Sequence, residues 1–178
     1  ENAICGSGDF LALVGKKNPT TTLYGIDWHI PNPLAEAFRQ IGVCPIVAPL
    51  DKIVLSDFIQ QKPDIITLWE VIEHIKIPDL KIMLSELNLS LKDDGYLVLS
   101  TPDFNDHHSK SLDFWAMAPG EHLSVFSLDS LNQILAGCGF EIVRVERESV
   151  TIKTYGRWYD YGAKTNQTIA GRGSARMI

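Results

Sequence analysis

Segments typical of β-strands alternate with segments typical of α-helices along most of this 178-residue chain. Apolar and β-branched side chains mark the strand-like segments, which are residues 21–26, 44–48, 65–68, 96–100 and 141–145. Amphipathic spacing and capping signals mark the helix-like segments, which are residues 9–16, 33–40, 80–91 and the stretch after Ser127. This order predicts an α/β fold with a mostly parallel central sheet and helices on both of its faces.

Individual segments add detail to this prediction. Residues 65–68 are apolar on both sides, as in a strand that is covered on both faces. Residues 141–145 alternate polar and apolar side chains, which is typical of a strand near the sheet edge. We expect Ser56 and Ser127 to cap the helices that follow them.

The two ends of the sequence suggest that the fold is cut. Only residues 1–5 are left for the strand that should precede the first glycine loop. Residues 171–178 read as a turn that enters one more strand. We therefore expect one Rossmann-like three-layer sandwich domain over residues 1–178, with its first and last strands truncated. A naturally short variant is the alternative.

Composition limits the classes of function. A content of 45% hydrophobic and 21% charged residues is typical of a globular protein. The formal charge of −6 disfavours a nucleic-acid partner, and the longest apolar runs are far shorter than a membrane span. The cysteines Cys5, Cys44 and Cys138 show no paired spacing, so we expect no disulfide framework and no zinc motif. With no signal peptide recognised, we expect a cytoplasmic location; the oligomeric state stays open.

Right-handed crossovers bring the carboxyl ends of parallel strands to one edge of a sheet, so we expect the chemistry in the loops there. Glycines in Cys5-Gly6-Ser7-Gly8 would let a ligand approach the backbone at a helix start. Asp27 follows about 20 residues later, the separation at which an acidic side chain binds ribose hydroxyls in nucleotide-binding folds. The structural alternatives are an ordinary small-residue turn and a solvated turn residue.

A dinucleotide is a poorer fit than a phosphate-free nucleoside. Leu11 occupies the position where the dinucleotide fingerprint needs its third glycine. The chain also has no lysine motif of the kind that binds nucleotide phosphates. A nucleotide-dependent oxidoreductase therefore stays only as an alternative function.

Six motifs occur in a fixed order along nearly the whole chain. They are CGSGDFL (5–11), YGID (24–27), WEVIEH (69–74), GYLVLSTP (95–102), EHLSVFS (121–127) and GCGF (137–140). In sequence and spacing this set resembles the class I S-adenosylmethionine-dependent methyltransferases. It is most similar to the subgroup that includes the ubiquinone-biosynthesis O-methyltransferases and related bacterial enzymes.

The resemblance implies a role for individual residues of the cofactor site. Gly6 and Gly8 would pass under the methionine part of S-adenosylmethionine, and Asp27 would hold its ribose. The other implied cofactor contacts lie in the same loops: Cys5, Ser7, Trp28, Leu50 and Asp51 near the nucleoside, and Leu68, Trp69 and Glu70 along the methionine side. An acidic pocket also suits a positively charged sulfonium.

Two departures from the family pattern favour a second alternative, a non-catalytic binding or regulatory module. Ile4 stands where the family has a glycine, and a β-branched residue resists positive backbone angles. Pro49 stands near the position of an acidic residue that often follows the third strand, with Asp51 beyond it.

Methyl transfer requires that the acceptor atom be held in line with the methyl carbon, and a hydroxyl acceptor also needs a base. His74, His107 and His122 are the candidate bases, because the pKa of histidine is ordinarily near neutral. Packing at a helix start, for His74, and a loop position, for His107, are the alternatives. We expect Trp115 and His122 to contact the acceptor, with residues 102–124 forming a lid; a hydrophobic plug is the alternative.

A metal site is a further alternative. Glu70, Glu73 and His74 would share one face of a helical turn and could together bind a divalent ion. In the resembling ubiquinone-pathway enzymes the matching residues are associated with a metal. Ordinary polarity at a helix start explains the same pattern, so we expect no metal.

Taken together, the motifs and their order predict an S-adenosylmethionine-dependent methyltransferase that acts on a small molecule. The sequence does not identify that molecule.

Overall fold

The computed structural model describes residues 8–105, 120, 122–150 and 164–173. The helices are α1 (Asp9–Lys17), α2 (Asn32–Gln40), α3 (Ile77–Ser90) and α4 (Leu128–Gly137). The strands are β1 (Leu23–Asp27), β2 (Val43–Val47), β3 (Ile65–Trp69), β4 (Tyr96–Pro102), β5 (Phe140–Val150) and β6 (Lys164–Gly173). Three short 3-10 helices, η1 (Leu50–Lys52), η2 (Leu55–Asp57) and η3 (Ile72–His74), lie in the connections. This order confirms the predicted α/β fold class.

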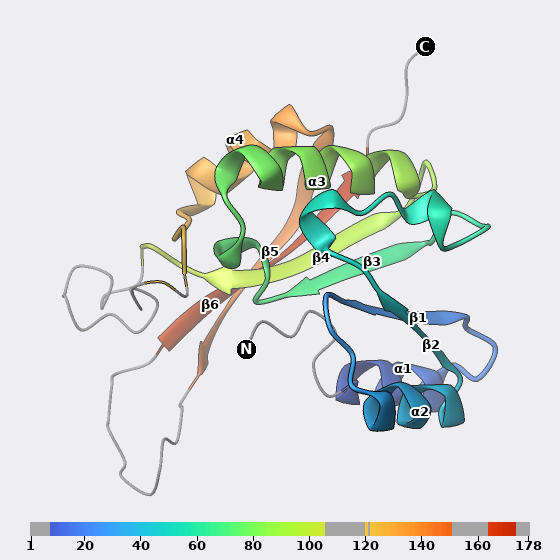
Figure 1. Ribbon diagram of the computed structural model, residues 1–178. Coiled ribbons are helices and arrows are strands. Elements are labelled where there is room, and N and C mark those ends of the chain that lie inside the picture. Colours follow the sequence, from blue (N-terminus) through green and yellow to red (C-terminus); the bar gives the residue numbers. More distant parts are fainter. Residues whose placement is uncertain (1–7, 106–119, 121, 151–163, 174–178) are drawn as a thin grey trace, which may run out of the picture.

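The strands form a two-stranded and a four-stranded sheet in the described part of the chain. β1 and β2 pair in parallel, and so do β3 and β4. β6 lies antiparallel between β4 and β5, so the order of the larger sheet is β3-β4-β6-β5. β5 is thus an edge strand of this sheet, as the alternating pattern of residues 141–145 predicted (Figure 1).

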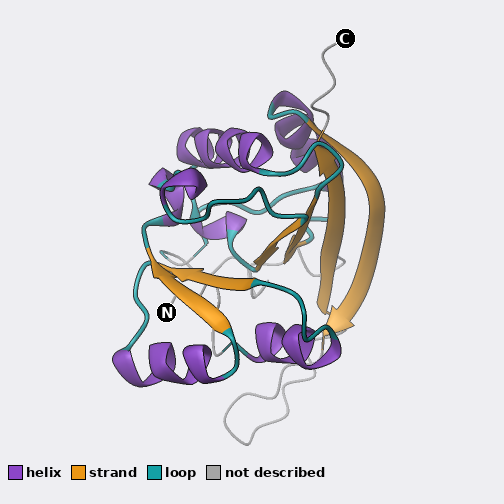
Figure 2. Ribbon diagram, turned by 90° about the vertical axis from the view of Figure 1, so that its right-hand side faces the viewer, coloured by secondary structure: helices purple, strands orange, loops and turns teal. Residues whose placement is uncertain are grey.

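Helices lie on two sides of the strands. α3 and α4 run across one side of the larger sheet, whereas α1 and α2 lie next to β1 and β2 (Figures 1 and 2). The α3 side chains at helical spacing are buried in the main core, as predicted; they are Leu80, Met83, Leu84 and Leu87. A smaller core forms around Phe38 of α2, which packs with Leu23 and Val43.

The register of β3 and β4 shows which of their paired side chains are buried and which are exposed. Leu68 pairs with Leu99, and both are buried in the main core. Ile65 pairs with Tyr96, and these side chains are 59% and 40% exposed. The predicted burial of residues 65–68 on both faces therefore holds for Leu68 but not for Ile65.

Of the helix caps and the turn predicted from the sequence, one cap is confirmed, and the other cap and the turn are wrong. The side chain of Ser127 accepts a hydrogen bond from the backbone N–H of Ser130 in a capping box at the start of α4, as predicted. Ser56 does not cap a helix; it lies inside η2. Gly171 and Gly173 do not form a turn but belong to β6, whose backbone pairs with β4 and β5. The predicted first strand lies outside the described residues.

None of the helices in the described part of the chain has the length and apolar character needed to cross a bilayer.

Candidate functional site

A cavity of about 340 Å³ is lined by residues from the loops that follow three strands. Trp28 follows β1, Leu50 and Asp51 follow β2, and Glu70 follows β3. The remaining lining residues are Pro49, Val71, His74, Ile75, Lys76, Asp79 and Leu123. The cavity thus lies at the carboxyl ends of the parallel strands, the edge at which the sequence predicted a ligand.

Asp27 is the last residue of β1, and its side chain is only 4% exposed. Its carbonyl accepts a hydrogen bond from the N–H of Ala48 after β2, at 2.9 Å. Its Oδ1 accepts the N–H of His29 at 3.4 Å. Asp27 itself does not line the cavity; the next residue in the chain, Trp28, is largely exposed and does line it.

Gly8, at the start of α1, has a φ angle of 80° and must be a glycine for a further reason. A Cβ at this position would lie 2.1 Å from Cε1 of Phe38 in α2. The glycine that the sequence assigned to ligand approach is therefore also required for packing against the smaller core. Three further predicted cofactor residues, Cys5, Gly6 and Ser7, lie outside the described residues.

Leu68 and Trp69 at the end of β3 have different surroundings. Leu68 packs in the main core rather than along the cavity. The ring of Trp69 meets that of Phe10 in α1 edge to face, with 5.3 Å between centroids. Its Nε1–H is buried and has no hydrogen-bond partner among the described residues, which is uncommon for a buried donor.

Glu70 joins β3 to η3 and contacts Ser100 of β4. The hydroxyl of Ser100 donates to Oε1 of Glu70 at 2.6 Å. The N–H of Glu70 donates to both the carbonyl and the Oγ of Ser100, at 3.1 and 3.2 Å. Burial raises the pKa of Glu70, while the Ser100 hydrogen bond and the nearby His74 act in the opposite direction.

Glu73 is fully buried, with an exposed fraction of 0%. The hydroxyl of Thr101 donates to its Oε2 at 3.1 Å, but its Oε1 has no partner among the described residues. Its carbonyl accepts the N–H groups of Leu123 and Ser124, at 2.7 and 3.1 Å. Burial first, and then the charge of Glu70, raise the pKa of Glu73 to about 8. This carboxyl group therefore favours its protonated form near neutral pH.

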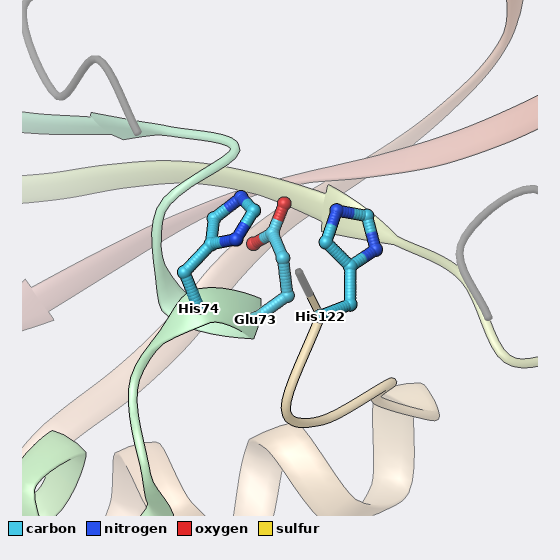
Figure 3. A group of neighbouring side chains, drawn as sticks. All are labelled: Glu73, His74 and His122. Carbon is cyan, nitrogen blue, oxygen red and sulfur yellow. The ribbon is translucent and has the colours of Figure 1, made fainter. Parts of the chain in front are cut away.

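The backbone contacts of Glu73 bring His122 next to His74. The two imidazole rings meet edge to face, with centroids 4.7 Å apart and planes at 75°. Ligand atoms of Glu73, His74 and His122 all lie within 4.8 Å of one another. Figure 3 shows the Glu73 side chain between the two rings. Two imidazoles and a buried carboxyl group can move a proton or bind a cation.

This cluster differs from the group that helical spacing suggested. Glu70 precedes η3 and has a φ angle of 53°, so it does not share a helical face with Glu73 and His74. His122, almost 50 residues further along the chain, takes its place in the cluster. His107 and Trp115, the other predicted base and acceptor contact, lie outside the described residues.

Sequence reasoning missed Ser100 and Thr101, the two hydroxyl residues near the end of β4. Each donates to one of the two carboxylates, Ser100 to Glu70 and Thr101 to Glu73. Both hydroxyl residues are buried, with exposed fractions of 8% and 0%. One sequence signal could have found them: two adjacent hydroxyl residues stand at the end of an apolar strand. Buried polar groups are normally hydrogen-bonded, so such a pair predicts polar partners in a neighbouring loop.

A family model for methyltransferase domains matches residues 5–145. No curated protein matches the chain.

Three solved structures illustrate the likeness in fold, and each is distant in sequence. A SAM-dependent methyltransferase from Methanosarcina mazei is 18% identical, with a TM-score of 0.70, and the alignment covers 94% of this chain and 88% of that one. The 1,6-didemethyltoxoflavin-N1-methyltransferase of Burkholderia thailandensis, solved with 1,6-didemethyltoxoflavin and S-adenosylhomocysteine, is 14% identical, with a TM-score of 0.67 and coverages of 97% and 69%.

The N,N-8-amino-8-demethyl-D-riboflavin dimethyltransferase of Streptomyces davawensis is 18% identical, with a TM-score of 0.69 and coverages of 95% and 47%. The chain spans about half the length of several of the solved proteins that it resembles.

Proposed function

The chain belongs to the methyltransferase-domain family, and from this premise we propose that it transfers a methyl group from S-adenosylmethionine to a small-molecule acceptor. One observation carries the proposal. A single cavity joins Trp28 after β1, Leu50 and Asp51 after β2, and Glu70 after β3. These are the loops in which the cofactor residues were expected.

The residues around the cavity fit this cofactor. Asp27 would accept hydrogen bonds from the ribose hydroxyls, and Leu50 and Asp51 would lie against the adenine. Trp69 offers a buried N–H without a partner among the described residues, at the side where the methionine part would lie. When bound, S-adenosylmethionine supplies a methyl group on a positively charged sulfur. Glu70, on the side of the cavity where the methionine part would lie, offers a carboxylate that favours such a cation.

The protein's own contribution is to orient the acceptor and to remove its proton. His122 is the proposed base for an acceptor hydroxyl, with His74 next to it. The buried Glu73 holds the segment of His122 through two backbone hydrogen bonds to its carbonyl. Two of the solved neighbours are methyltransferases for a riboflavin derivative and a toxoflavin precursor, which supports a small aromatic or heterocyclic acceptor. His107 and Trp115 would belong to the acceptor side as well.

Mass spectrometry tests this function. The chain is incubated with S-adenosylmethionine and a fraction of small metabolites, and we expect one metabolite to gain a methyl group. His122→Ala should lower kcat by about 100-fold or more, the usual contribution of a general base, and should leave the affinity for S-adenosylhomocysteine unchanged. If no metabolite is methylated but S-adenosylhomocysteine binds, a non-catalytic binding module becomes the better account.

A metal-assisted variant of the same function is a second candidate. Its support is Oε1 of Glu73, a buried oxygen without a partner among the described residues, which lies beside His74 and His122. One carboxylate and two imidazoles form a donor set that transition metals accept. Elemental analysis of the purified protein tests it, with a Glu73→Gln variant as the control. Full activity in a strong chelator, with no metal in the protein, would reject it.

A further inference from the structure

Glu70 is the one non-glycine residue with a positive φ angle in the part of the chain that the structure describes, at 53°. It is the first residue after β3, and the chain turns from there into η3. A non-glycine residue in the left-handed region is strained and persists only where its surroundings hold it there. Such strain is concentrated at functional sites, so the groups that hold Glu70 are of interest.

Ser100 contacts both the backbone and the side chain of Glu70. It pairs with Trp69 in the parallel ladder of β3 and β4, which places it beside the next residue, Glu70. Its carbonyl and its Oγ both accept the N–H of Glu70, at 3.1 and 3.2 Å. Its hydroxyl in turn donates to Oε1 of Glu70 at 2.6 Å, a short bond of the kind formed with charged acceptors.

These contacts fix a residue that lines the cavity. Ser100 itself is only 8% exposed and does not line the cavity, whereas Glu70 does. We infer that Ser100 is a positioning residue, which holds Glu70 in its left-handed conformation and orients its carboxylate at the wall where the cofactor binds. Its hydroxyl is both acceptor and donor in these contacts, which alanine cannot replace and threonine can.

The effect on ligand binding rests on the proposed function and is measured by calorimetry with S-adenosylhomocysteine. In Ser100→Ala the Glu70 carboxylate is no longer held at the wall of the cavity. The Kd should therefore rise about tenfold, the effect of losing one hydrogen bond between the ligand and a charged group. Ser100→Thr should keep the Kd within about threefold of the wild-type value. Ser85→Ala is the matched control, since the hydroxyl of Ser85 donates to the carbonyl of Lys81 on the exposed side of α3. It should leave the Kd unchanged.

A second measurement needs no ligand. Glu70→Gly removes the backbone strain together with the carboxylate. In the wild-type background this change also loses the hydrogen bond to Ser100, whereas in the Ser100→Ala background that bond is already absent. Glu70→Gly should therefore raise the Tm more, or lower it less, in the Ser100→Ala background than in the wild-type background. The difference should be about 3 °C for a chain of this size. Equal changes in the two backgrounds would contradict the inference.

The two measurements separate the two failures. If the wild-type chain does not bind S-adenosylhomocysteine but the Tm changes differ between the backgrounds, the proposed function fails and the role of Ser100 in holding Glu70 stands. If the wild-type chain binds S-adenosylhomocysteine and Ser100→Ala binds it equally well, the inference is overturned and the proposed function is unaffected.

Discussion

The two halves of the candidate site are built by different kinds of interaction. The first half, around β1, α2 and β2, depends on packing and on the backbone: Gly8 fits against Phe38, and backbone hydrogen bonds between the strand ends place Asp27. The second half, around β3, η3 and β4, depends on polar contacts: the carboxyl groups of Glu70 and Glu73 each accept a hydrogen bond from a hydroxyl of β4. The first half should therefore respond to steric changes, and the second to pH and to the loss of single hydrogen bonds.

The largest expected effect of a single substitution at one pH tests the steric half. Gly8→Ala places a Cβ against Phe38, at a position with a φ angle of 80°. We expect a loss of about 3 to 4 kcal/mol in the free energy of unfolding, the sum of overpacking and left-handed strain. Urea denaturation measures it. Gly42→Ala is the matched control, because Gly42 has a φ angle of 77° and no atom within 4 Å of an added Cβ.

Only the strain contribution, about 1 kcal/mol, should appear at Gly42. If the two alanine variants lost the same free energy of unfolding, packing against Phe38 would not explain why position 8 requires a glycine.

The next effect tests the polar half through pH. Burial raises the pKa of Glu73 from 4.5 in the unfolded chain to about 8 in the folded protein. Between these two values the folded state holds a proton that the unfolded state has released. The contribution of Glu73 to stability is therefore fully present below about pH 4.5 and is lost as the pH rises toward 8.

The slope of this loss is at most about 1.4 kcal/mol per pH unit. Glu73→Gln cannot ionise, so its unfolding free energy should depend less on pH between 5 and 8 than that of the wild-type chain. Urea denaturation at several pH values compares them, with Glu36→Gln on the exposed face of α2 as the control. Parallel pH profiles for wild type and Glu73→Gln would show that the polar half does not titrate in this way.

A smaller effect concerns one hydrogen bond of the polar half. Thr101→Val keeps the shape of the side chain but removes the donor to Oε2 of Glu73. We expect a loss of about 1 to 2 kcal/mol in the free energy of unfolding, because the buried carboxyl group then loses this side-chain donor. Thr101→Ser should recover most of this loss. A valine variant as stable as the wild type would mean that Glu73 does not depend on this bond.

The smallest effect on stability returns to the first half. Trp28 is 61% exposed on the wall of the cavity. Trp28→Ala should change the free energy of unfolding by less than about 0.5 kcal/mol, as surface changes usually do. The same change should weaken the binding of S-adenosylhomocysteine about fivefold, the effect of losing one aromatic contact. Calorimetry and urea denaturation on the same sample separate the two effects.

The same contrast explains what the sequence could predict. Asp27 and the loop residues of the first half follow from strand order and spacing, because parallel strands bring their carboxyl ends to one edge. The roles of Ser100 and Thr101 could not be read in this way, because each acts on a carboxylate about 30 residues earlier in the chain. Which residues of β4 lie opposite Trp69 and Glu70 is decided by the register of the sheet.

The cluster around Glu73 shows a second limit. Helical spacing grouped Glu70 with Glu73 and His74, but a left-handed residue at position 70 breaks that helix geometry. His122 joins the cluster because Leu123 and Ser124 donate to the carbonyl of Glu73, a tertiary contact that spacing does not predict. Likewise, the need for glycine at position 8 was predicted, but its contact with Phe38 was not.

Calorimetric titration with S-adenosylhomocysteine, on the wild-type chain and on Asp27→Ala, tests the central claim most directly. We expect micromolar binding by the wild-type chain and at least about tenfold weaker binding by the variant, which loses a charged hydrogen-bond acceptor at the ribose. Equal affinity of the two proteins, or no binding by a wild-type chain that is shown to be folded, would contradict the claim that the carboxyl ends of β1, β2 and β3 form a nucleoside site.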